Sequence, residues 1–466
     1  MAAAAAGAML AMRGFIVDDA WIPVRYARHL ADGLGYVWNE GSPRSDGVTP
    51  LPYAVLLSGM ARRASAEDVL QRARLLGAGA WLLASGGLGA ALARAAASVP
   101  LRLIAGAIVA LSLPVAAHAV SGLETGIVMA LVTAAAACLA SAPDAPRMRG
   151  LALLFASLVP AFRPEMAAWA FVLASGASLL DRPARDPRAL LRAVAFGSLS
   201  LLPWVATFVL RAVVFGSPMP LSLLAKPSDL AHGLSYVAAA GLAALGPVFA
   251  FAPLAAARAG GPGAVLLASG AAHLVAIALA GGDWMPYARL VAPIVPSLAL
   301  GAVLVDARAS ALGRALRATG ALGLGAWLFV TAAPAGRRVV DERRVLAESA
   351  RPLLASSRRV ATVDIGWPSS VSEAAIVDLA GLTDPVVARL PGGHTSKRVD
   401  PALLLDRDPD ALLFFARGTS PADAVYLHIV EARLAASDVI RSHYAPQAFV
   451  ALGGGTGYVV WKRTDR

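Results

Sequence analysis

The sequence predicts a polytopic α-helical membrane protein with a separate α/β domain at its C-terminus. Of its 466 residues, 58% are hydrophobic and only 15% are charged, whereas soluble domains average about 25% charged residues. Ala-rich stretches with almost no charge recur from residue 1 to about 334, and many have the roughly 17–25 residues that a helix needs to cross a bilayer. Beyond residue 335 the charge rises and short β-rich runs appear.

The apolar stretches predict about eleven membrane-spanning helices. They lie near residues 2–17, 75–93, 101–119, 122–140, 149–161, 165–180, 193–214, 236–257, 263–281, 286–305 and 318–334. The first, "AAAAAGAMLAMRGFIV", lacks the basic start and the cleavage site of a signal peptide. We therefore expect an uncleaved first span, and the true start of the chain could lie upstream of Met1.

The orientation depends on residues 49–61, "TPLPYAVLLSGMA", which are short and contain two prolines. If this stretch does not span, the outer loops after residue 75 carry only Arg163, Lys226 and Arg289, and the other loops are rich in arginine. The inner loops then hold Arg94, Arg102, Arg147, Arg149, Arg182, Arg185, Arg188, Arg192, Arg258, Arg308, Arg314 and Arg317. Cytoplasmic loops carry the excess of Lys and Arg, so we predict a cytoplasmic N-terminus, an outer loop over residues 18–74 and an outer C-terminus.

The distribution of charge argues against nucleic-acid binding. Residues 1–334 contain 24 Lys and Arg against 15 Asp and Glu, and residues 335–466 contain 17 against 15. The excess therefore sits in short loops between apolar stretches, where it sets topology. The single cysteine, Cys138, lies in an apolar run and offers neither a disulfide framework nor a cysteine metal site.

This topology gathers ionisable residues on the outer face of the membrane. They are Asp18, Asp19, Glu124, Arg163, Glu165, Lys226, Asp283 and Arg289. Ionisable groups at membrane depth are costly and usually mark a substrate path. Acids, cations and aromatic residues at the bilayer edge suit a substrate with a lipid tail, a phosphate and a sugar. A simpler interpretation remains open for Arg163 and Glu165, which could form only a local salt bridge.

Trp21 to Leu34 predicts an amphipathic helix in the first outer loop. Arg25, Arg28, His29 and Asp32 are spaced three and four apart and so share one face. Such a helix can lie among lipid headgroups with its cations directed at phosphate. The alternative is an interfacial anchor that binds no ligand.

The adjacent acids Asp18 and Asp19 have a chemical interpretation of their own. Like charges side by side raise the pKa of one carboxyl, which makes it a better general base, while the other can orient an acceptor or bind a metal ion. A base contributes roughly 10²–10⁴-fold to a rate, and a cation on the departing phosphate stabilises the charge that develops there.

Several motifs in order along the chain carry a family resemblance. "DDAWIPVRYARHLADGLGYVWNEG", "SGLETG", "FRPE", "PMPLSLLAK" and "GGDWMPYAR" together resemble the GT-C superfamily of polyprenyl-phosphate-dependent glycosyltransferases. The order of these motifs resembles that in the branch of mycobacterial terminal arabinofuranosyltransferases. The tail also resembles this branch at residues 363–389, "VDIGWPSSVSEAAIVDLAGLTDPVVAR". The sequence departs from that branch in the first outer loop, where "SPRSDGVTPLPY" stands in place of the segment usual in the branch. The identity of the acceptor is therefore left open.

The resemblance implies a catalytic pair, Asp18 and Asp19, with Glu124 as an acceptor or metal contact. The outer-face acids Glu165 and Asp283 are further candidates for that contact. Candidates for binding the donor phosphate are Arg25, Arg28, Arg163, Lys226 and Arg289. It implies transfer of a sugar, arabinofuranose by analogy with that branch, from a polyprenyl phosphate to an envelope glycan or lipid, within a bacterial plasma membrane and on its outer side. No cofactor is certain, and the acidic outer loops could hold Mg²⁺ or Mn²⁺.

The chain divides in this interpretation into a GT-C-like membrane module, 1–334, and an extracytoplasmic α/β domain, 335–466, which the resemblance implies helps to bind the acceptor. Strands are predicted at 358–366, 411–416 and 457–463 and a helix at 422–437, with "GGGTG" at 453–457 as a turn and His394 as a loop residue. Two other functions compete with glycosyl transfer. A transporter or flippase would place charges near mid-span and show two similar halves, and a noncatalytic assembly partner would use the tail for sensing.

Overall fold

The computed structural model describes residues 1–466 except 96, 181–185, 250–260, 306–310 and 466. Its contacts group the chain into two compact units. Unit 1 comprises Met1–Phe15, Ala73–Phe208 and Ser228–Arg337, and unit 2 comprises Ile16–Arg72, Val209–Pro227 and Arg338–Arg466. The end of the predicted span 236–257 and the predicted inner-loop residues Arg182, Arg185, Arg258 and Arg308 lie outside the described residues.

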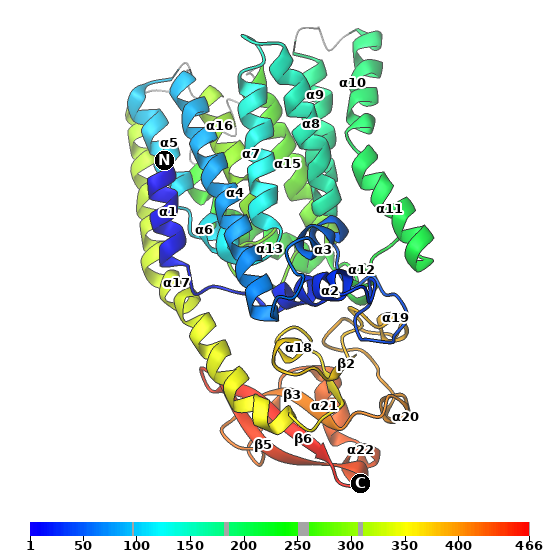
Figure 1. The fold of residues 1–466 in the computed structure, drawn as a ribbon. Helices are drawn as coiled ribbons and strands as arrows, with labels where there is room; N and C mark the ends of the chain where they lie inside the picture. Colours follow the sequence, from blue (N-terminus) through cyan, green and yellow to red (C-terminus); the bar gives the residue numbers. More distant parts are fainter. Residues whose placement is uncertain (96, 181–185, 250–260, 306–310, 466) are drawn as a thin grey trace. The chain divides into compact units, whose positions relative to one another are not determined.

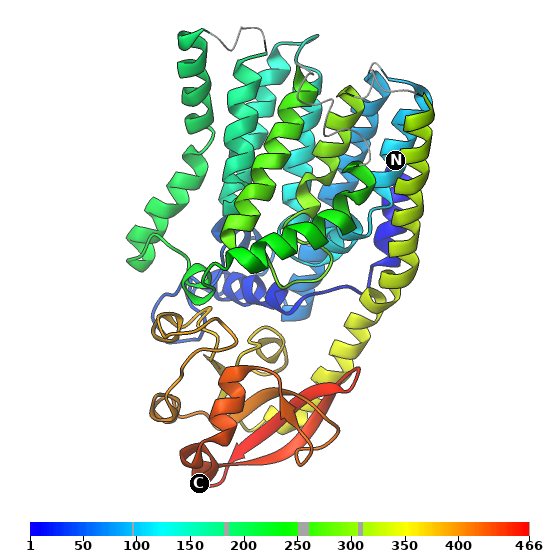
Figure 2. The same cartoon turned by 180° about the vertical axis from the view of Figure 1, so that it is seen from behind.

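Unit 1 is helical. Its elements are α1 (Ala2–Ala11), most of α4 (Ala66–Arg94), α5 (Val99–Ala110), α6 (Leu113–Val120), α7 (Thr125–Ala140), α8 (Arg147–Phe162), η2 (Pro164–Met166), α9 (Ala167–Ser178), α10 (Pro187–Leu199), the start of α11 (Leu202–Phe215), α13 (Leu230–Phe249), α15 (Pro262–Ala280), η3 (Ala292–Ile294), α16 (Val295–Val305) and the first part of α17 (Ala311–Leu354). Helices α7, α8, α9 and α15 run side by side (Figure 1), and α13 crosses α15 at an angle (Figure 2).

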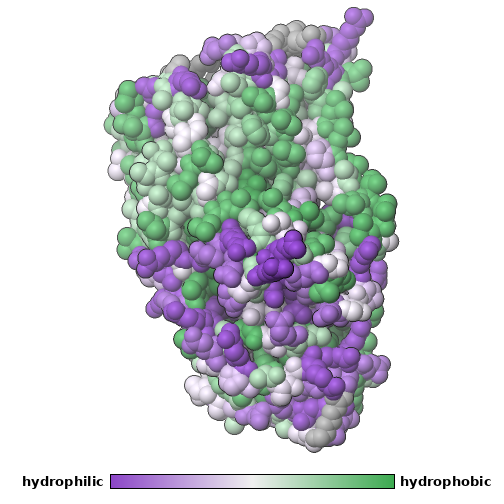
Figure 3. All heavy atoms as spheres, in the orientation of Figure 1, coloured by the Kyte–Doolittle hydropathy of each residue, from purple (hydrophilic) through white to green (hydrophobic). Residues whose placement is uncertain are grey.

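Three described helices are long and apolar enough to cross a bilayer: α4, α15 and residues 318–354 of α17. The pairs α5–α6 and α10–α11, bent by 45° and 43°, raise the number to five if each pair is one broken span. Other apolar helices, including α1 and α7, are shorter. On the visible face of unit 1 the side chains are largely hydrophobic (Figure 3). These features support a membrane protein, and the count of eleven spans stays a prediction.

Close helix packing in unit 1 depends on small residues. A Cβ on Gly126, at the start of α7, would lie 2.6 Å from the Cα of Gly77 in α4. A Cβ on Gly77 would in turn lie 2.8 Å from the carbonyl oxygen of Ala119. Glycines let helix backbones approach closely within membranes. The last residue of "SGLETG" is therefore glycine because α4 and α7 touch there.

Unit 2 is built around a mixed six-stranded sheet. The strands are β1 (Arg359–Thr362), β2 (Ala375–Asp378), β3 (Ala411–Arg417), β4 (Val425–Tyr426), β5 (Tyr444–Gly453) and β6 (Thr456–Arg463). The order is β2-β1-β3-β6-β5, with β4 paired to β3. Strand β1 is parallel to β2 and β3, and the other pairs are antiparallel. Gly454 and Gly455, with φ of 58° and 73°, form the β5–β6 turn, which is the backbone conformation that tight hairpins require.

The remaining elements of unit 2 are short helices and the end of α17. They are η1 (Asp18–Ala20), α2 (Trp21–Ala31), α3 (Leu51–Ser58), α12 (Leu221–Ala225), α18 (Pro368–Val371), α19 (Pro385–Ala388), α20 (Pro401–Asp406), α21 (Ile429–Ala436) and α22 (Asp438–His443). Helix α2 stops before Gly33 and Gly35, which have φ of 80° and 87°. Helix α3, with 8 residues, is too short to cross a bilayer.

The predicted strands of the tail correspond to β1, β3 and β6. The helix predicted at 422–437 is wrong in its first half, because Val425 and Tyr426 pair with the end of β3 and only α21 is helical. Backbone pairing with the preceding strand, β3, overrides local helix propensity here. Helix α17 also continues to Leu354, well beyond the predicted end of the last span at 334.

Candidate active site

Asp18 is held by the backbone of the C-terminal domain. Its Oδ2 accepts a hydrogen bond from the N–H of Gly366 at 2.9 Å, and its Oδ1 accepts one from the N–H of Trp367 at 2.8 Å. The guanidinium of Arg343 lies 3.9 Å from Oδ1. Burial raises the pKa of Asp18 to about 7, and the carboxylate of Asp364 adds to the rise while Arg343 opposes it.

Asp19 differs from its neighbour. Its side chain is half-buried, and no hydrogen bond or ion pair joins its carboxylate to the part of the chain that the structure describes. Its electrostatic neighbours include His394, which also interacts with Lys226. Burial, with Lys226 contributing, lowers the pKa of His394 to about 4, so this imidazole is neutral at pH 7. An unpaired carboxylate and a lysine therefore each lie within electrostatic range of one neutral histidine in unit 2.

Two further acids of unit 2 belong to the same electrostatic network. The hydroxyl of Tyr458 donates to Asp364 Oδ2 at 2.6 Å. Glu431 is fully buried; its Oε2 accepts the N–H of Phe415 at 2.9 Å and lies 3.0 Å from Nδ1 of His428. Burial raises the pKa of Glu431 to about 7, and contact with Glu431 raises that of His428. We call Asp18, Asp19, Lys226, Asp364, His394, His428 and Glu431 the unit 2 cluster.

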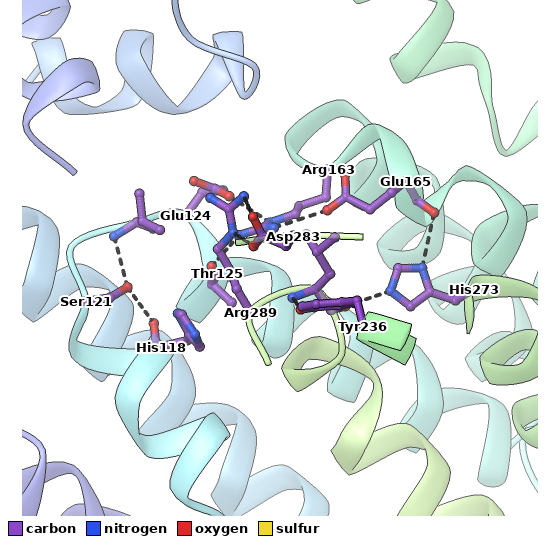
Figure 4. Close-up of polar contacts among 12 residues, drawn as sticks. His118, Ser121, Glu124, Thr125, Arg163, Glu165, Tyr236, His273, Asp283 and Arg289 are labelled. Carbon is purple, nitrogen blue, oxygen red and sulfur yellow. Dashed lines mark hydrogen bonds and ion pairs between the residues drawn. The ribbon is translucent and has the colours of Figure 1, made fainter. Parts of the chain in front are cut away.

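A second group of predicted residues meets in unit 1 (Figure 4). Arg163, only 4% exposed, has its Nε 2.7 Å from Glu124 Oε1 and its NH1 3.1 Å from Glu165 Oε1. The same guanidinium donates to Thr125 Oγ1 at 2.6 Å. Arg163 leaves α8 in an extended conformation before Pro164 begins η2. A glutamate of the 121–126 turn and one of the 160–166 turn thus share one buried cation.

The segment between α15 and η3 brings Asp283 and Arg289 into this group (Figure 4). Nε and NH2 of Arg289 donate to the two carboxylate oxygens of Asp283 at 2.7 and 3.1 Å. Between them, Tyr287 and Ala288 have φ of 58° and 51°, a left-handed conformation that costs a residue with a Cβ roughly 1–2 kcal/mol. Such backbone strain persists only where the surrounding structure imposes it, and strained residues of this kind are common at functional sites.

His273 of α15 links two of these loops. Its ring nitrogens lie 3.1 Å from the carbonyl oxygen of Glu165 and 2.8 Å from that of Leu290. We call Glu124, Arg163, Glu165, Asp283 and Arg289 the unit 1 cluster. It carries three acids and two arginines, and each arginine is engaged by an acid of the cluster.

The two cations predicted on α2 have different surroundings. Arg25, 8% exposed, donates to the carbonyl oxygens of Trp38 at 2.7 Å and Ala374 at 3.2 Å, and to Asn39 Oδ1 at 3.3 Å. Its contacts therefore tie the first outer loop to the segment before β2. Arg28 is half-buried, and no hydrogen bond joins its guanidinium to the described residues.

The sequence analysis missed a buried pair in unit 2. Arg211 Nε lies 2.6 Å from Asp46 Oδ2, and their side chains are 1% and 3% exposed. The available signal was a lone arginine inside the predicted span 193–214. His394 is predicted from the sequence only as a loop residue, and His428 and Glu431 are not predicted as site residues, although their spacing of three residues at the start of α21 was an available signal.

Within the described residues, no group of three or more His, Cys, Asp or Glu side chains is arranged to hold a metal ion. In unit 2 both oxygens of Asp18 accept backbone N–H groups, and Asp364 accepts from Tyr458. These donors do not fit a divalent cation, and no step below passes through one.

Comparison with known proteins returns two kinds of match. A family model described as "Domain of unknown function (DUF8728)" matches residues 336–461. No curated protein matches the chain. A mutant of arabinofuranosyltransferase AftD from Mycobacteria is similar at 16% identity, with a TM-score of 0.49, over 99% of this chain and 41% of that one; the chain thus spans about two fifths of AftD.

Two structures of an oligosaccharyltransferase from Archaeoglobus fulgidus are also similar. The apo form has 13% identity and a TM-score of 0.47 over 88% of this chain and 69% of that one. AglB, in complex with an inhibitory peptide and a dolichol-phosphate, has 12% identity and a TM-score of 0.48 over 91% and 74%.

Proposed function

We propose that this protein is a membrane glycosyltransferase of the GT-C kind. It moves a sugar from a polyprenyl phosphate to an envelope glycan or lipid. By analogy with the branch that the sequence resembles, the sugar is arabinofuranose. The observation that carries the proposal is that the adjacent aspartates Asp18 and Asp19 have different surroundings. Asp18 is fixed by two backbone N–H groups, while Asp19 keeps an unpaired carboxylate in electrostatic reach of His394, which is itself in reach of Lys226. A carboxylate base and a cation suit removal of a hydroxyl proton together with departure of a phosphate.

The reaction follows from these positions. Asp19 takes the proton of an acceptor hydroxyl, and the oxygen forms a bond to C1 of the donor sugar. The bond between C1 and the phosphate oxygen breaks, and the polyprenyl phosphate leaves with the electron pair, its charge stabilised by Lys226. Asp18 acts as a positioning residue, because its contacts with Gly366 and Trp367 fix the backbone that carries Asp19.

Unit 1 contains an apolar cavity. It has a volume of about 400 Å³ and is lined almost wholly by apolar residues of α5, α6, α13 and α17, a lining that suits a lipid chain. The unit 1 cluster holds three loops in one arrangement through its ion pairs. Acceptor or metal contact by Glu124, Glu165 and Asp283, and phosphate contact by Arg163 and Arg289, stay predictions.

The test compares single Asp→Asn variants in membranes that contain the full chain. The substrate is a polyprenyl-phospho-arabinofuranose with a labelled sugar, and transfer to a synthetic arabinofuranose oligosaccharide is measured. Asp19→Asn should lower the transfer rate by about 10²–10⁴-fold at unchanged protein abundance. Asp406→Asn, an exposed acid of the same unit, should leave it unchanged. Transfer by Asp19→Asn at the wild-type rate would remove the assignment of the base.

The proposal also requires the C-terminal domain to lie outside the cytoplasm of a bacterial cell. After Cys138→Ala, a cysteine introduced at the exposed position of Ala422 should react with a membrane-impermeant maleimide in intact cells. A cysteine at Asp144, which is exposed on a predicted inner loop, should react only after the membrane is opened. The reverse pattern would refute the topology and, with it, the proposed reaction.

A further inference from the structure

The pair formed by His428 and Glu431 has a geometry that the proposed reaction leaves unused. The two residues stand three apart at the start of α21, with His428 as the residue before the helix. Glu431 is fully buried, and its Oε2 lies 3.0 Å from Nδ1 of His428. The imidazole also lies against the ring of Phe415, with 5.5 Å between ring centroids. The orientation of the His428 ring is therefore set from two sides.

The free edge of this imidazole is its Nε2. Nδ1 lies 3.0 Å from Oε2 of Glu431 but makes no hydrogen bond within the described residues. Nε2 lies on the opposite edge of the ring, and no hydrogen bond joins it to the described residues either. The His428 side chain is 16% exposed. A carboxylate this close to the ring favours a proton on the imidazole. The pair thus presents one oriented polar atom to solvent.

His428 belongs to the same cluster as the proposed base. It interacts electrostatically with Asp364 and with His394, and His394 interacts with Asp19 and Lys226. The charged groups around His428 and His394 include the carboxylates of Asp19, Asp364 and Glu431 and the ammonium of Lys226. Sugar hydroxyls both donate to carboxylates and bond to imidazole nitrogens. The carboxylates and the imidazole of His428 therefore suit a polyol.

We propose that His428, oriented by Glu431, binds a hydroxyl group of the acceptor sugar through Nε2 and so determines acceptor affinity. The inference rests on the proposed function, because it assigns the ligand beside Asp19 as the acceptor. Glu431 is then a positioning residue, and His428 contacts substrate without taking part in bond breaking. The C-terminal domain in this way contributes to recognition of the sugar that receives the transfer.

Two substitutions at one position separate this role from a structural one. In His428→Asn the amide nitrogen takes the place of Nδ1 and keeps the contact with Glu431, but the side chain is too short to replace Nε2. In His428→Gln the amide reaches the place of Nε2. Both are measured in full-length protein in membranes, with polyprenyl-phospho-arabinofuranose at saturation and a synthetic arabinofuranose oligosaccharide as the varied acceptor.

The expected result is a KM for the oligosaccharide raised about tenfold or more in His428→Asn, with kcat changed far less, and a smaller rise in His428→Gln. A tenfold rise in KM corresponds to the loss of one hydrogen bond to a substrate. An unchanged KM in His428→Asn overturns the inference. An equal loss of kcat and of melting temperature in both variants overturns it as well, because a purely structural role predicts that pattern.

The same assay distinguishes failure of the inference from failure of the proposed function. If the wild-type protein transfers no sugar from the polyprenyl phosphate, the proposed function fails. If wild-type transfer is robust, Asp19→Asn abolishes it and His428→Asn behaves as wild type, the inference alone is refuted. Binding of the oligosaccharide to wild-type and His428→Asn protein without donor gives a second readout, and equal affinities there also refute it.

Discussion

A single methyl group at Gly366 should misplace the acidic pair. This glycine donates its N–H to Asp18, and its Cα lies so close to η1 that an added Cβ would meet the carbonyl oxygen of Asp18 at 2.1 Å and its Oδ2 at 2.6 Å. The carbonyl oxygen belongs to the peptide bond that leads into Asp19. The substitution Gly366→Ala therefore acts directly on the backbone that carries the proposed base.

The displacement follows from these distances. Ordinary contact for a Cβ begins at 3.4 Å. The nearest atom, the carbonyl oxygen of Asp18, belongs to the backbone, so the two backbones must separate by about 3.4 − 2.1 = 1.3 Å. A misplacement of about 1 Å in a catalytic arrangement can cost on the order of 10²-fold in rate. We expect Gly366→Ala to lower sugar transfer by about 10²-fold, although no reacting group is removed.

The assay is transfer of labelled sugar from polyprenyl-phospho-arabinofuranose in membranes, with melting temperature and protein abundance measured in parallel. Gly59→Ala is the matched control, because Gly59 has φ of −61° and its added Cβ would lie 3.6 Å from its nearest neighbour. That variant should transfer at the wild-type rate. If Gly366→Ala also does so, the position of Asp18 and Asp19 relative to Gly366 has no part in the reaction.

Three other predictions concern stability. Arg163→Met should lower the free energy of unfolding by about 3–5 kcal/mol, because it leaves buried carboxylates unpaired, and a denaturant titration showing no change would contradict the ion pairs of unit 1. Asp378, 1% exposed, accepts the N–H and the hydroxyl of Thr383 on one oxygen; Asp378→Asn should cost about 2–6 kcal/mol by leaving both donors unpaired, whereas Asp406→Asn should cost nothing measurable. The pKa of Asp18 is raised from 3.8 to about 7, so the folded state keeps this proton to higher pH than the unfolded chain. The free energy of unfolding should therefore fall by up to about 4 kcal/mol as pH rises from about 4 to about 7. Asp18→Asn should flatten that slope, and an unchanged slope would contradict the shift.

Composition and charge were enough to predict several features of this chain. Long apolar runs and loops with unequal arginine content are local properties, and they predicted a membrane protein and the set of outer-loop residues. Glu124, Arg163, Glu165, Asp283 and Arg289 were selected in this way, and they do meet in unit 1. The reason is that the topology rule places loop ends on one face before any packing is known.

The roles of individual cations could not be predicted from spacing. Arg25 and Arg28 share a face of the helix predicted at 21–34, yet Arg25 is bonded to backbone oxygens near β2 and Arg28 is not. Likewise the buried pair of Arg211 and Asp46 joins residues separated by 165 positions. Helical periodicity shows which side chains are neighbours on one element, and it carries no information about the partner element.

The sequence alone therefore predicted the membrane class, the acidic doublet and the charged residues at the ends of the apolar runs, since hydropathy and charge can be read residue by residue. The different surroundings of Asp18 and Asp19 were decided by tertiary structure, because the N–H groups that hold Asp18 belong to residues 348 and 349 positions away. The same holds for His394, His428 and Glu431. The pKa of a side chain, and which of its polar atoms have partners, depend on the residues that pack against it. This packing exists only in the folded chain.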